Sequence, residues 1–361
     1  MPTGLPRPAS GPVLALDIGG TWFRSALVGP QRCIRDRRAV PAISRRNHPG
    51  ATPAELKERL VDHLVAEARA RAATEPGLAR VGISMGAALH QHTGVIWNSG
   101  PLWGDDATPF DLPTKLRQRA PDLVWHVVND VSAALLALVL GAAEPPTHDV
   151  CYITVSTGIA ARIWSHRAGG IVVDEISGLQ GEIGHLPVMA EFLGRVLPTV
   201  CDCGGAQHLN SVSSGRGIAT VLAHIANEYP VVAAALGIVP GADPVEAFTR
   251  ALERDAPFAR DVLSTCLRPL ATCVLSMIAC NPAVTKIHFG GGVTAGLGKA
   301  RWKDALVTEL DRYGAYQISS RKPGFFHDLI DVVDATDLGL VGAGLVALRA
   351  APANLVPLEA I

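Results

Sequence analysis

The stretch that decides the fold is VLALDIGGTWFRSALV, residues 13–28. Its two apolar-rich runs, residues 13–16 and 22–28, flank a turn that contains the pair Gly19-Gly20. Two extended runs joined across a short glycine turn predict a β-hairpin.

The same order of strand, small-residue turn and strand recurs in the second half of the chain. Residues 150–155 and 159–164 are apolar runs on either side of a turn at Thr157-Gly158, and a proline pair at 145–146 precedes them as a linker. Two halves that open with the same hairpin predict an internally duplicated fold of two lobes with a central cleft. Both turns would then face one polyphosphate.

The first turn has the composition of a phosphate-binding turn. Paired glycines, Gly19 and Gly20, let the backbone approach a phosphate closely, and Thr21 adds a hydroxyl donor. Asp17 at the end of the first strand could hold Mg²⁺, directly or through water. Glycine hairpins without any ligand are common, so the turn alone leaves both interpretations open. No Gly-Lys-Ser/Thr follows, which excludes a Walker loop.

Helices and strands follow the first hairpin, as expected of an α/β fold. Apolar spacing predicts a helix over residues 53–73 and strands over 80–85 and 122–128. The last of these strands runs into Asn129-Asp130, just before a segment rich in Ala and Leu. A carboxylate at the C-terminal end of a strand is where α/β proteins place catalytic groups, although Asp130 could also cap the following helix.

The C-terminal half adds helices and one further glycine-rich turn. Helices are expected over residues 215–228, 245–254, 259–280 and 338–348, and a strand over 285–289. That strand leads into Gly290-Gly291-Gly292-Val293, where a flat ligand such as adenine could rest on bare backbone.

The composition predicts a soluble globular protein. Of the 361 residues, 48% are hydrophobic and 18% charged, with 32 Lys plus Arg against 33 Asp plus Glu. This balance gives no electrostatic argument for a nucleic-acid partner, and residues 1–12 lack the apolar run of a signal peptide. Seven cysteines, an odd number, fit reduced thiols and a metal site better than a disulfide framework. We therefore expect a cytoplasmic protein that does not span a membrane.

A glycine-rich segment in the middle of the chain combines four side chains that bind zinc well. His185, Cys201, Cys203 and His208 supply two imidazoles and two thiolates, the number of ligands in a structural zinc site. The Cys-x-Cys pair alone could equally be a turn with two small residues, and the two histidines favour a metal. Glu182 lies three residues before His185, and a carboxylate and an imidazole on one loop suit a ligand with several hydroxyls.

Taken together, these motifs resemble the sugar kinases of the ROK family (repressor, open reading frame, kinase). They occur in the family's order: Asp17-Ile18-Gly19-Gly20-Thr21, Asn129-Asp130, Gly181-Glu182-Ile183-Gly184-His185, Cys201-x-Cys203-Gly204 and Gly290-Gly291-Gly292-Val293. The resemblance spans residue 13 to about residue 348 and implies an actin-like ATPase (ribonuclease H-like) fold. We expect an N-terminal lobe of residues 1–145, on which the C-terminal helix 338–361 packs, and a C-terminal lobe of residues 146–337.

The resemblance also assigns roles to individual residues. The catalytic base falls on Asp130, and the sugar contacts fall on Asn98, Asn129, Asp130, Glu182, His185 and Asn210. The phosphate turns fall on Asp17, Gly19, Gly20 and Thr21 and on Thr157 and Gly158, and the adenosine turn falls on Gly291 and Gly292. Zinc falls on His185, Cys201 and Cys203, with His208 as the fourth ligand. The implied cofactors are ATP, Mg²⁺ and a structural Zn²⁺, and a homodimer is expected.

The chain departs from the family pattern in two places. In the motif Cys-x-Cys-Gly-x-x-Gly-Cys-x-Glu it has Gln207 for the last glycine, His208 for the third cysteine and Asn210 for the glutamate. His208 can still bind zinc. Asn210 replaces an acceptor-only carboxylate with an amide that also donates, which either alters the sugar preference or keeps the glucose contact at lower affinity. Ala160, Ala161 and Arg162 stand where the family tends to carry glycines.

The sequence therefore predicts a kinase that transfers the γ-phosphoryl group of ATP to the 6-hydroxyl of a glucose-like hexose, with Asp130 as general base. Glucose, kanosamine, glucosamine and N-acetylmannosamine are the candidate substrates. A ROK-type repressor is disfavoured, because only twelve residues precede Val13 and its winged-helix segment would have to lie there. A sugar-sensing protein without turnover is the other alternative, and the presence of Asp130 argues against it.

Overall fold

The structure is a computed structural model that describes residues 11–142, 144 and 146–349. The proline- and glycine-rich start of the chain, Pro145 of the expected linker, and the part of the expected C-terminal helix after residue 349 lie outside the described residues. The chain divides into two compact units. The first consists of residues up to 145, Val173–Leu179 and the residues from Thr336 onward, and the second of Pro146–Val172 and Gln180–Ala335.

The short segment Val173–Leu179 belongs to the first unit, although the sequence placed it within a continuous lobe of residues 146–337. Hydrogen bonds explain its position. The backbone N–H of Gln91 donates to Gly178 O at 3.0 Å, and Trp97 Nε1 donates to Ser177 O at 2.8 Å. The periodicity of the sequence does not predict these contacts, because they join segments that are far apart in the chain.

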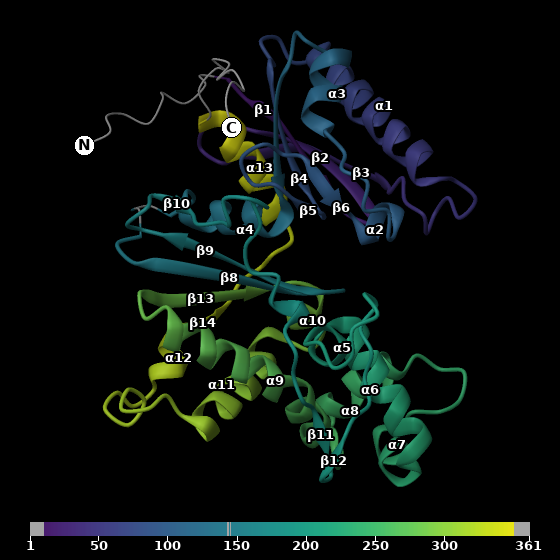
Figure 1. Ribbon diagram of the computed structural model, residues 1–361, viewed down its shortest axis with the longest axis vertical. Helices are drawn as coiled ribbons and strands as arrows, with labels where there is room; N and C mark the ends of the chain where they lie inside the picture. Colours follow the sequence, from purple (N-terminus) through teal and green to yellow (C-terminus); the bar gives the residue numbers. More distant parts are fainter. Residues whose placement is uncertain (1–10, 143, 145, 350–361) are drawn as a thin grey trace. The chain divides into compact units, whose positions relative to one another are not determined.

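The first unit contains a five-stranded mixed sheet in the order β3-β2-β1-β4-β7 (Figure 1). Its strands are β1 Val13–Ile18, β2 Trp22–Val28, β3 Ile34–Pro41, β4 Arg80–Met85 and β7 Val124–Asn129. The first three pair antiparallel in succession, whereas β4 lies parallel to β1 and β7 parallel to β4. The hairpin predicted over residues 13–28 is confirmed.

Successive side chains of β1 point to opposite faces of the sheet, and all six residues of the strand are buried. Leu14 and Leu16 lie in one core with residues of three helices, and Val13 and Ala15 lie in a second core with the last helix that the structure describes. The helices of this unit are α1 Pro53–Ala72, α2 Gly100–Trp103, α3 Leu112–Arg119, α4 Asp130–Val139 and α13 Leu338–Arg349.

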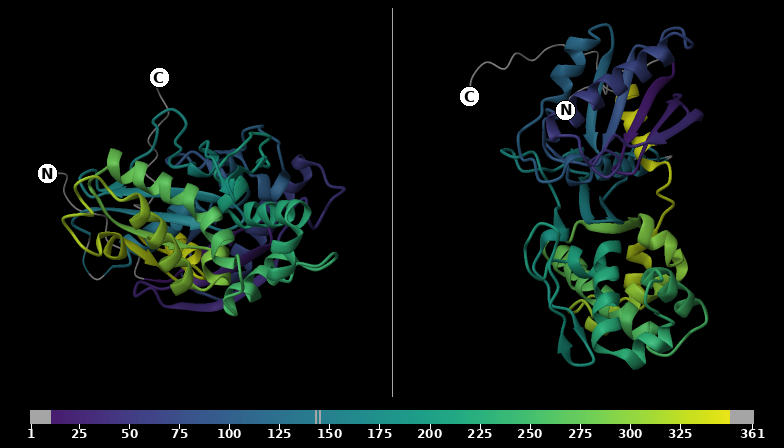
Figure 2. Two further views of the ribbon diagram at one scale, coloured as in Figure 1. Left: turned by 90° about the horizontal axis from the view of Figure 1, so that it is seen from below. Right: turned by 90° about the vertical axis from the view of Figure 1, so that its right-hand side faces the viewer.

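Helix α13 closes the first unit although it comes from the far end of the chain. Figure 2 shows this yellow helix beside the purple strands of the chain's start. It also packs tightly on α4, since a Cβ built on Gly342 would lie 1.8 Å from the carbonyl oxygen of Ala133. Only glycine allows two helix backbones to approach this closely.

The second unit repeats this topology with a sheet in the order β10-β9-β8-β13-β14. Its strands are β8 Asp149–Val155, β9 Ile159–Ser165, β10 Gly170–Ile171, β13 Val284–Gly290 and β14 Ile330–Val332. Here too the first two strands form an antiparallel hairpin, and the parallel strand β13 pairs with the first strand. The internal duplication predicted from the two hairpins is therefore confirmed at the level of topology.

The remaining elements cover the second sheet or lie in its loops. They are the 3-10 helix η1 Ile183–His185, strands β11 Glu191–Phe192 and β12 Arg195–Val196, and helices α5 Asn210–Ser213, α6 Gly215–Glu228, α7 Pro230–Leu236, α8 Pro244–Glu253, α9 Ala259–Cys280, α10 Gly292–Gly296, α11 Lys299–Tyr313 and α12 Phe325–Leu329. In the first unit, residues 86–103 are more regular than the sequence indicates, because they contain the hairpin of β5 Ala88–Leu89 and β6 Ile96–Asn98.

Among the described residues, α9 is the one helix long and apolar enough to cross a membrane. More than half of its apolar window, 56%, is buried inside the protein, and Val262, Cys266 and Leu270 lie in the core of the second unit. The apolar character of α9 is therefore that of a core helix.

Candidate active site and metal centre

Three parallel strands bring the first glycine turn and Asp130 to one edge of the first sheet. Their register aligns Ile18 at the end of β1 with Met85 of β4, and Met85 with Asn129 of β7. The C-terminal ends of parallel strands are where α/β proteins bind ligands. A Cβ on Gly86 would lie 3.5 Å from Ile18 O and 3.6 Å from Asp130 Oδ2, so the turn and the carboxylate are neighbours.

Asn129 holds the start of α4 and so places Asp130. The Oδ1 atom of Asn129 accepts hydrogen bonds from the backbone N–H groups of Val131 at 2.9 Å and Ser132 at 3.1 Å. Its side-chain amide donates to Ala87 O at 2.8 Å. The helix cap is therefore Asn129, and the interpretation of Asp130 as that cap is wrong. The buried Asn129 side chain therefore positions Asp130. One N–H of its amide bonds to Ala87 O and the amide has a second, so its sugar contact stays a prediction.

Asp130 is the first residue of α4 and is half-buried. Its Oδ1 atom accepts a hydrogen bond from the Val131 N–H at 2.9 Å. The N-terminus of a helix stabilises negative charge nearby. The carboxylate is thus held in one orientation by the backbone that follows it.

Asn98 carries an unsatisfied polar atom at the same edge. It pairs with Ala88 in the β5–β6 hairpin, and its buried Oδ1 atom accepts no hydrogen bond from any residue that the structure describes. A buried acceptor without a donor is rare in proteins and calls for an explanation. A hydroxyl group of a ligand would satisfy it, which is consistent with the predicted sugar contact.

Asp17 is less accessible to a metal than the sequence indicates. Arg24 Nη2 lies 2.5 Å from its Oδ2 atom, and Ser84 Oγ donates to its Oδ1 atom at 2.8 Å. Only 7% of the residue is exposed. Each carboxylate oxygen keeps a further lone pair beside its partner, so a Mg²⁺ contact of Asp17, directly or through water, stays a prediction.

The four predicted zinc ligands come together in the second unit. His185, Cys201, Cys203 and His208 each offer one ligand atom, and these atoms lie within 4.8 Å of one another. Cys203 Sγ is 3.2 Å from His208 Nδ1, and the two imidazole rings meet edge to face. Zn–S and Zn–N bonds of ~2.3 Å and ~2.1 Å place tetrahedral ligand atoms roughly 3.4 to 3.8 Å apart. Small adjustments of the side chains would therefore accommodate one ion.

Backbone pairing on both sides of His208 builds this cluster. Leu209 N donates to Leu186 O at 3.0 Å, and Val188 N donates to Gln207 O at 2.7 Å. Gln207 adopts a φ of 52°, in the left-handed region that glycine enters without cost. The family pattern has glycine at this position, and the observed φ gives the physical reason.

The Glu182 carboxylate of the second unit is held by Arg162 of β9. Arg162, only 2% exposed, places its Nη2 atom 3.1 Å from Glu182 Oε1, and its Nη1 atom donates to the backbone oxygens of Ala161 and Gln180. Arg24 plays the same part for a carboxylate in the first hairpin. The sequence shows Arg162 only as a departure near a phosphate turn, and its contact with Glu182 is a tertiary one that spacing does not predict.

The second phosphate turn and the adenosine turn are neighbours within this unit. Gly215 N donates to Ser156 O at 2.7 Å, and a Cβ on Gly292 would lie 3.5 Å from Ser156 Oγ. Gly291 has a φ of 119°, a conformation open mainly to glycine. The turn at Thr157-Gly158 therefore lies beside the turn at the end of β13.

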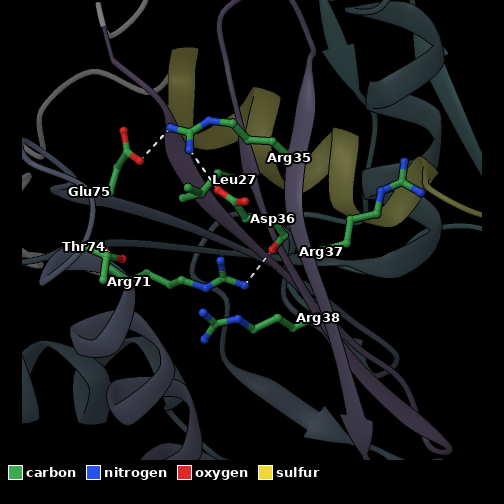
Figure 3. A pocket seen from close by; sticks show the side chains of 8 residues that line it. All are labelled: Leu27, Arg35, Asp36, Arg37, Arg38, Arg71, Thr74 and Glu75. Carbon is green, nitrogen blue, oxygen red and sulfur yellow. Dashed lines mark hydrogen bonds and ion pairs between the residues drawn. The ribbon is translucent and has the colours of Figure 1, made fainter.

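A pocket of about 460 Å³ lies elsewhere in the first unit, between β3 and the end of α1 (Figure 3). Its charged side chains pair with groups of the same unit: Arg35 lies 2.6 Å from Glu75, and Arg71 donates to Asp36 O at 2.8 Å. None of the predicted site residues lines it. This pocket is therefore separate from the candidate catalytic residues.

The sequence model of the ROK family matches residues 13–345. The chain belongs to the ROK family. The family membership predicted from the motifs is confirmed, and the two mixed five-stranded sheets are those of the actin-like ATPase fold.

Curated ROK relatives cover nearly the whole chain. A 2-epi-5-epi-valiolone 7-kinase of Actinoplanes sp. is 39% identical over 96% of this chain and 95% of its own length. A C(7)-cyclitol 7-kinase of Streptomyces hygroscopicus subsp. jinggangensis is 33% identical over 84% of this chain and 85% of its own. An N-acetylmannosamine kinase of Shigella flexneri is also 33% identical, over 93% of this chain and 98% of its own.

Solved ROK structures share the fold at lower identity. A ROK family glucokinase from Streptomyces griseus, in complex with glucose and AMPPNP, superposes with a TM-score of 0.68 at 23% identity, covering 94% of this chain and 100% of that one. A ROK hexokinase from Thermus thermophilus gives a TM-score of 0.65 at 22% identity, covering 93% and 97%. At this identity the likeness establishes the fold alone.

Proposed function

We propose that this chain is an ATP-dependent kinase that phosphorylates the 7-hydroxyl of a C7 cyclitol. The observation that carries the proposal is 39% identity, over nearly the full length of both chains, to a 2-epi-5-epi-valiolone 7-kinase. The hexose 6-hydroxyl expected from the sequence is a closely related group. In both molecules the acceptor is a primary alcohol on the carbon outside a six-membered ring, so the same machinery serves either.

In the proposed reaction the primary hydroxyl of the cyclitol attacks the γ-phosphorus of ATP. A new O–P bond forms, the bond between the γ-phosphorus and the β,γ-bridging oxygen breaks, and ADP leaves. Asp130 accepts the hydroxyl proton, since its carboxylate is fixed at the start of α4 by Asn129 and the backbone. Asn98 would accept a hydrogen bond from another hydroxyl of the substrate.

The glycine turns of the two units are the proposed nucleotide-binding elements. Gly19, Gly20 and Thr21 of the first unit and Thr157 and Gly158 of the second would bind phosphate oxygens through backbone N–H groups and hydroxyls. Gly291 and Gly292 would support the adenosine. Mg²⁺, when bound, would supply positive charge to the phosphates, and Asp17 would hold it directly or through water.

A structural zinc ion is proposed at His185, Cys201, Cys203 and His208. The donor set is chemically suitable, and the four ligand atoms are already close together. When bound, the ion would cross-link the loop that carries Glu182 to the segment that leads into α5. The ion would then hold His185 in place, and we propose that His185 also contacts the substrate. A homodimer in the cytoplasm remains our prediction for the assembly and its location.

A second candidate is phosphorylation of N-acetylmannosamine. It is supported by the 33% identity to N-acetylmannosamine kinase over 93% of the chain. The same fold and the same proposed catalytic groups would serve this substrate, so only specificity separates the two candidates.

A substrate panel with coupled ADP detection tests the proposal. The panel contains 2-epi-5-epi-valiolone, glucose, glucosamine, kanosamine and N-acetylmannosamine, and phosphorus NMR of the product locates the phosphate. We expect the cyclitol to give the highest kcat/KM, by at least about tenfold, with phosphate on carbon 7. A higher value for N-acetylmannosamine would establish the second candidate, and ATP turnover with none of the five would overturn both.

A further inference from the structure

We propose that Asn210 is a specificity-determining residue that presents a hydrogen-bond donor to the ketone oxygen of the substrate. The inference rests on the proposed function and names the chemical group that the site is built to accept. The oxygen and nitrogen ends of the Asn210 side-chain amide have different surroundings in the structure.

The oxygen end of the amide is engaged by the protein. Asn210 Oδ1 accepts a hydrogen bond from the backbone N–H of Ile159 at 2.7 Å. An N–H group can only donate, so its partner must be the amide oxygen, and this contact fixes which way the amide points.

The surrounding backbone holds the side chain in this position. A Cβ on Gly184 would lie 2.4 Å from Asn210 Oδ1, and one on Gly158 would lie 3.7 Å from the same atom. Any side chain at position 184 would therefore overlap the Asn210 amide. The backbone of Asn210 is also held, because Ser214 Oγ donates a hydrogen bond to its carbonyl oxygen at 2.6 Å.

The nitrogen end of the amide is what remains for a ligand. Among the described residues none accepts a hydrogen bond from Nδ2, and Asn210 is half-buried. Gly184 precedes His185 of the proposed substrate loop, and Gly158 belongs to the proposed phosphate turn. Asn210 thus lies beside both elements, which in the proposed reaction hold the substrate and the phosphate.

A lone donor selects among the groups that a ring can carry. A ketone oxygen only accepts, and a hydroxyl can accept, so both pair with Nδ2. An ammonium group only donates, so opposite Nδ2 it would leave two donors facing each other. A carboxylate at this position, as in the family motif, has the reverse preference because it only accepts. The suffix of valiolone denotes a ketone, and an amide donor is the group that suits it. Kanosamine and glucosamine are disfavoured in any pose that places their amino groups against Asn210.

The matched variant is Asn210→Asp. Aspartate has nearly the same shape and keeps an oxygen for the Ile159 N–H, while the donor at the other end becomes an acceptor. The substrates are three cyclitols that differ at one carbon: 2-epi-5-epi-valiolone, the alcohol made by reducing its ketone, and the amine made by reductive amination. The readout is the ratio of their kcat/KM values, because any effect of the new charge on ATP binding is common to all three.

For the wild type we expect the ketone and the alcohol to agree within about tenfold and the amine to be worse by about 10²-fold, as expected where buried groups are left unpaired. In Asn210→Asp the ratio of ketone to amine should fall by at least about 10²-fold, with the alcohol changed least. An unchanged ratio in a folded variant would overturn the role of Asn210 while leaving the proposed function intact. If the variant does not fold, the wild type still decides, since equal use of amine and ketone overturns the inference. Failure of the wild type to phosphorylate any of the three overturns the proposed function instead.

Discussion

The substitution Asp130→Asn replaces one carboxylate oxygen with an NH2 group. It removes the proposed proton acceptor and preserves the shape of the side chain. We expect Asp130→Asn to lower kcat by about 10² to 10⁴, the range of a general base, while the Kd of the substrate changes only severalfold. The cap of α4 is provided by Asn129, so the variant should fold.

Stopped assays of ADP release and calorimetric titration of the substrate measure the two quantities. Asp304→Asn, at an exposed carboxylate on α11, is the matched control and should behave as wild type. A near-normal kcat in Asp130→Asn would remove Asp130 from the chemistry.

Arg162 offers a second test at the level of one residue. It is buried and holds Glu182 while also donating to two backbone oxygens, a geometry that a lysine ammonium does not reproduce. We expect Arg162→Lys to raise the KM of the substrate about tenfold with kcat within about threefold, because Glu182 loses its fixed orientation.

The control for this variant is Arg250→Lys, which alters an exposed pair with Glu246 on α8 and should leave both constants unchanged. Equal losses of kcat and kcat/KM in Arg162→Lys would point to a role in the transition state. No change in either constant would show that Glu182 does not contact the substrate.

At the scale of elements, we predict that the segment from η1 to α5 depends on a bound zinc ion. We expect one zinc per chain, and we expect Cys203→Ser to lose it, because three ligands bind the ion far more weakly than four. The KM of the substrate should rise, since His185 is then no longer fixed, and Tm should fall by several degrees.

Elemental analysis of purified protein and thermal scans measure these effects. Cys280→Ser replaces an exposed thiol at the end of α9 and serves as the control. Protein that carries no zinc and keeps full activity would contradict the assignment.

The three cysteines of α9 show how far an element can be predicted from spacing. A spacing of seven residues places Cys266, Cys273 and Cys280 on one face of a helix. The sequence therefore predicts that all three are small buried residues. Cys266 is buried, Cys273 is partly buried and Cys280 is exposed. Burial raises the pKa of Cys266 to about 12 and that of Cys273 to about 11. The progression has a geometric reason, because a heptad spacing drifts by ~20° per step around a helix.

Regular elements with strong apolar spacing were predictable almost to the residue. The strand Arg80–Met85 and the helix Ala259–Cys280 have the bounds expected from sequence alone. The hairpin of β5 and β6 was not predictable, since it is short and is fixed by contacts with β7 and with Val173–Leu179. The same holds at the candidate site. The motifs predict Asp130 and a four-residue zinc cluster whose members the structure brings together, whereas the partners of Asp17, Glu182 and Asn210 are tertiary contacts that the motifs do not predict.

At the scale of the whole molecule, the first unit requires both ends of the described chain. Val13, Ala15 and Val28 of the N-terminal hairpin share a core with Leu345 of α13 and its neighbours. We expect Gly342→Val to destabilise the protein by at least about 3 kcal/mol, because a side chain at this position overlaps the backbone of α4.

Urea unfolding measures this change, with Gly296→Ala as the control. Nothing lies within 4 Å of a Cβ built on Gly296, so the control should lose far less stability. A Gly342→Val variant as stable as wild type would show that α13 does not pack on α4 in solution.

The return of α13 to the first sheet also has a consequence for synthesis on the ribosome. The strands of the first unit emerge early, yet one face of their sheet stays uncovered until the residues after Thr336 have been made. At roughly 5 to 20 residues per second, the intervening second unit takes on the order of 10 to 40 seconds to synthesise. During that interval the apolar side chains of Val13, Ala15 and Val28 lack the partners that α13 later provides.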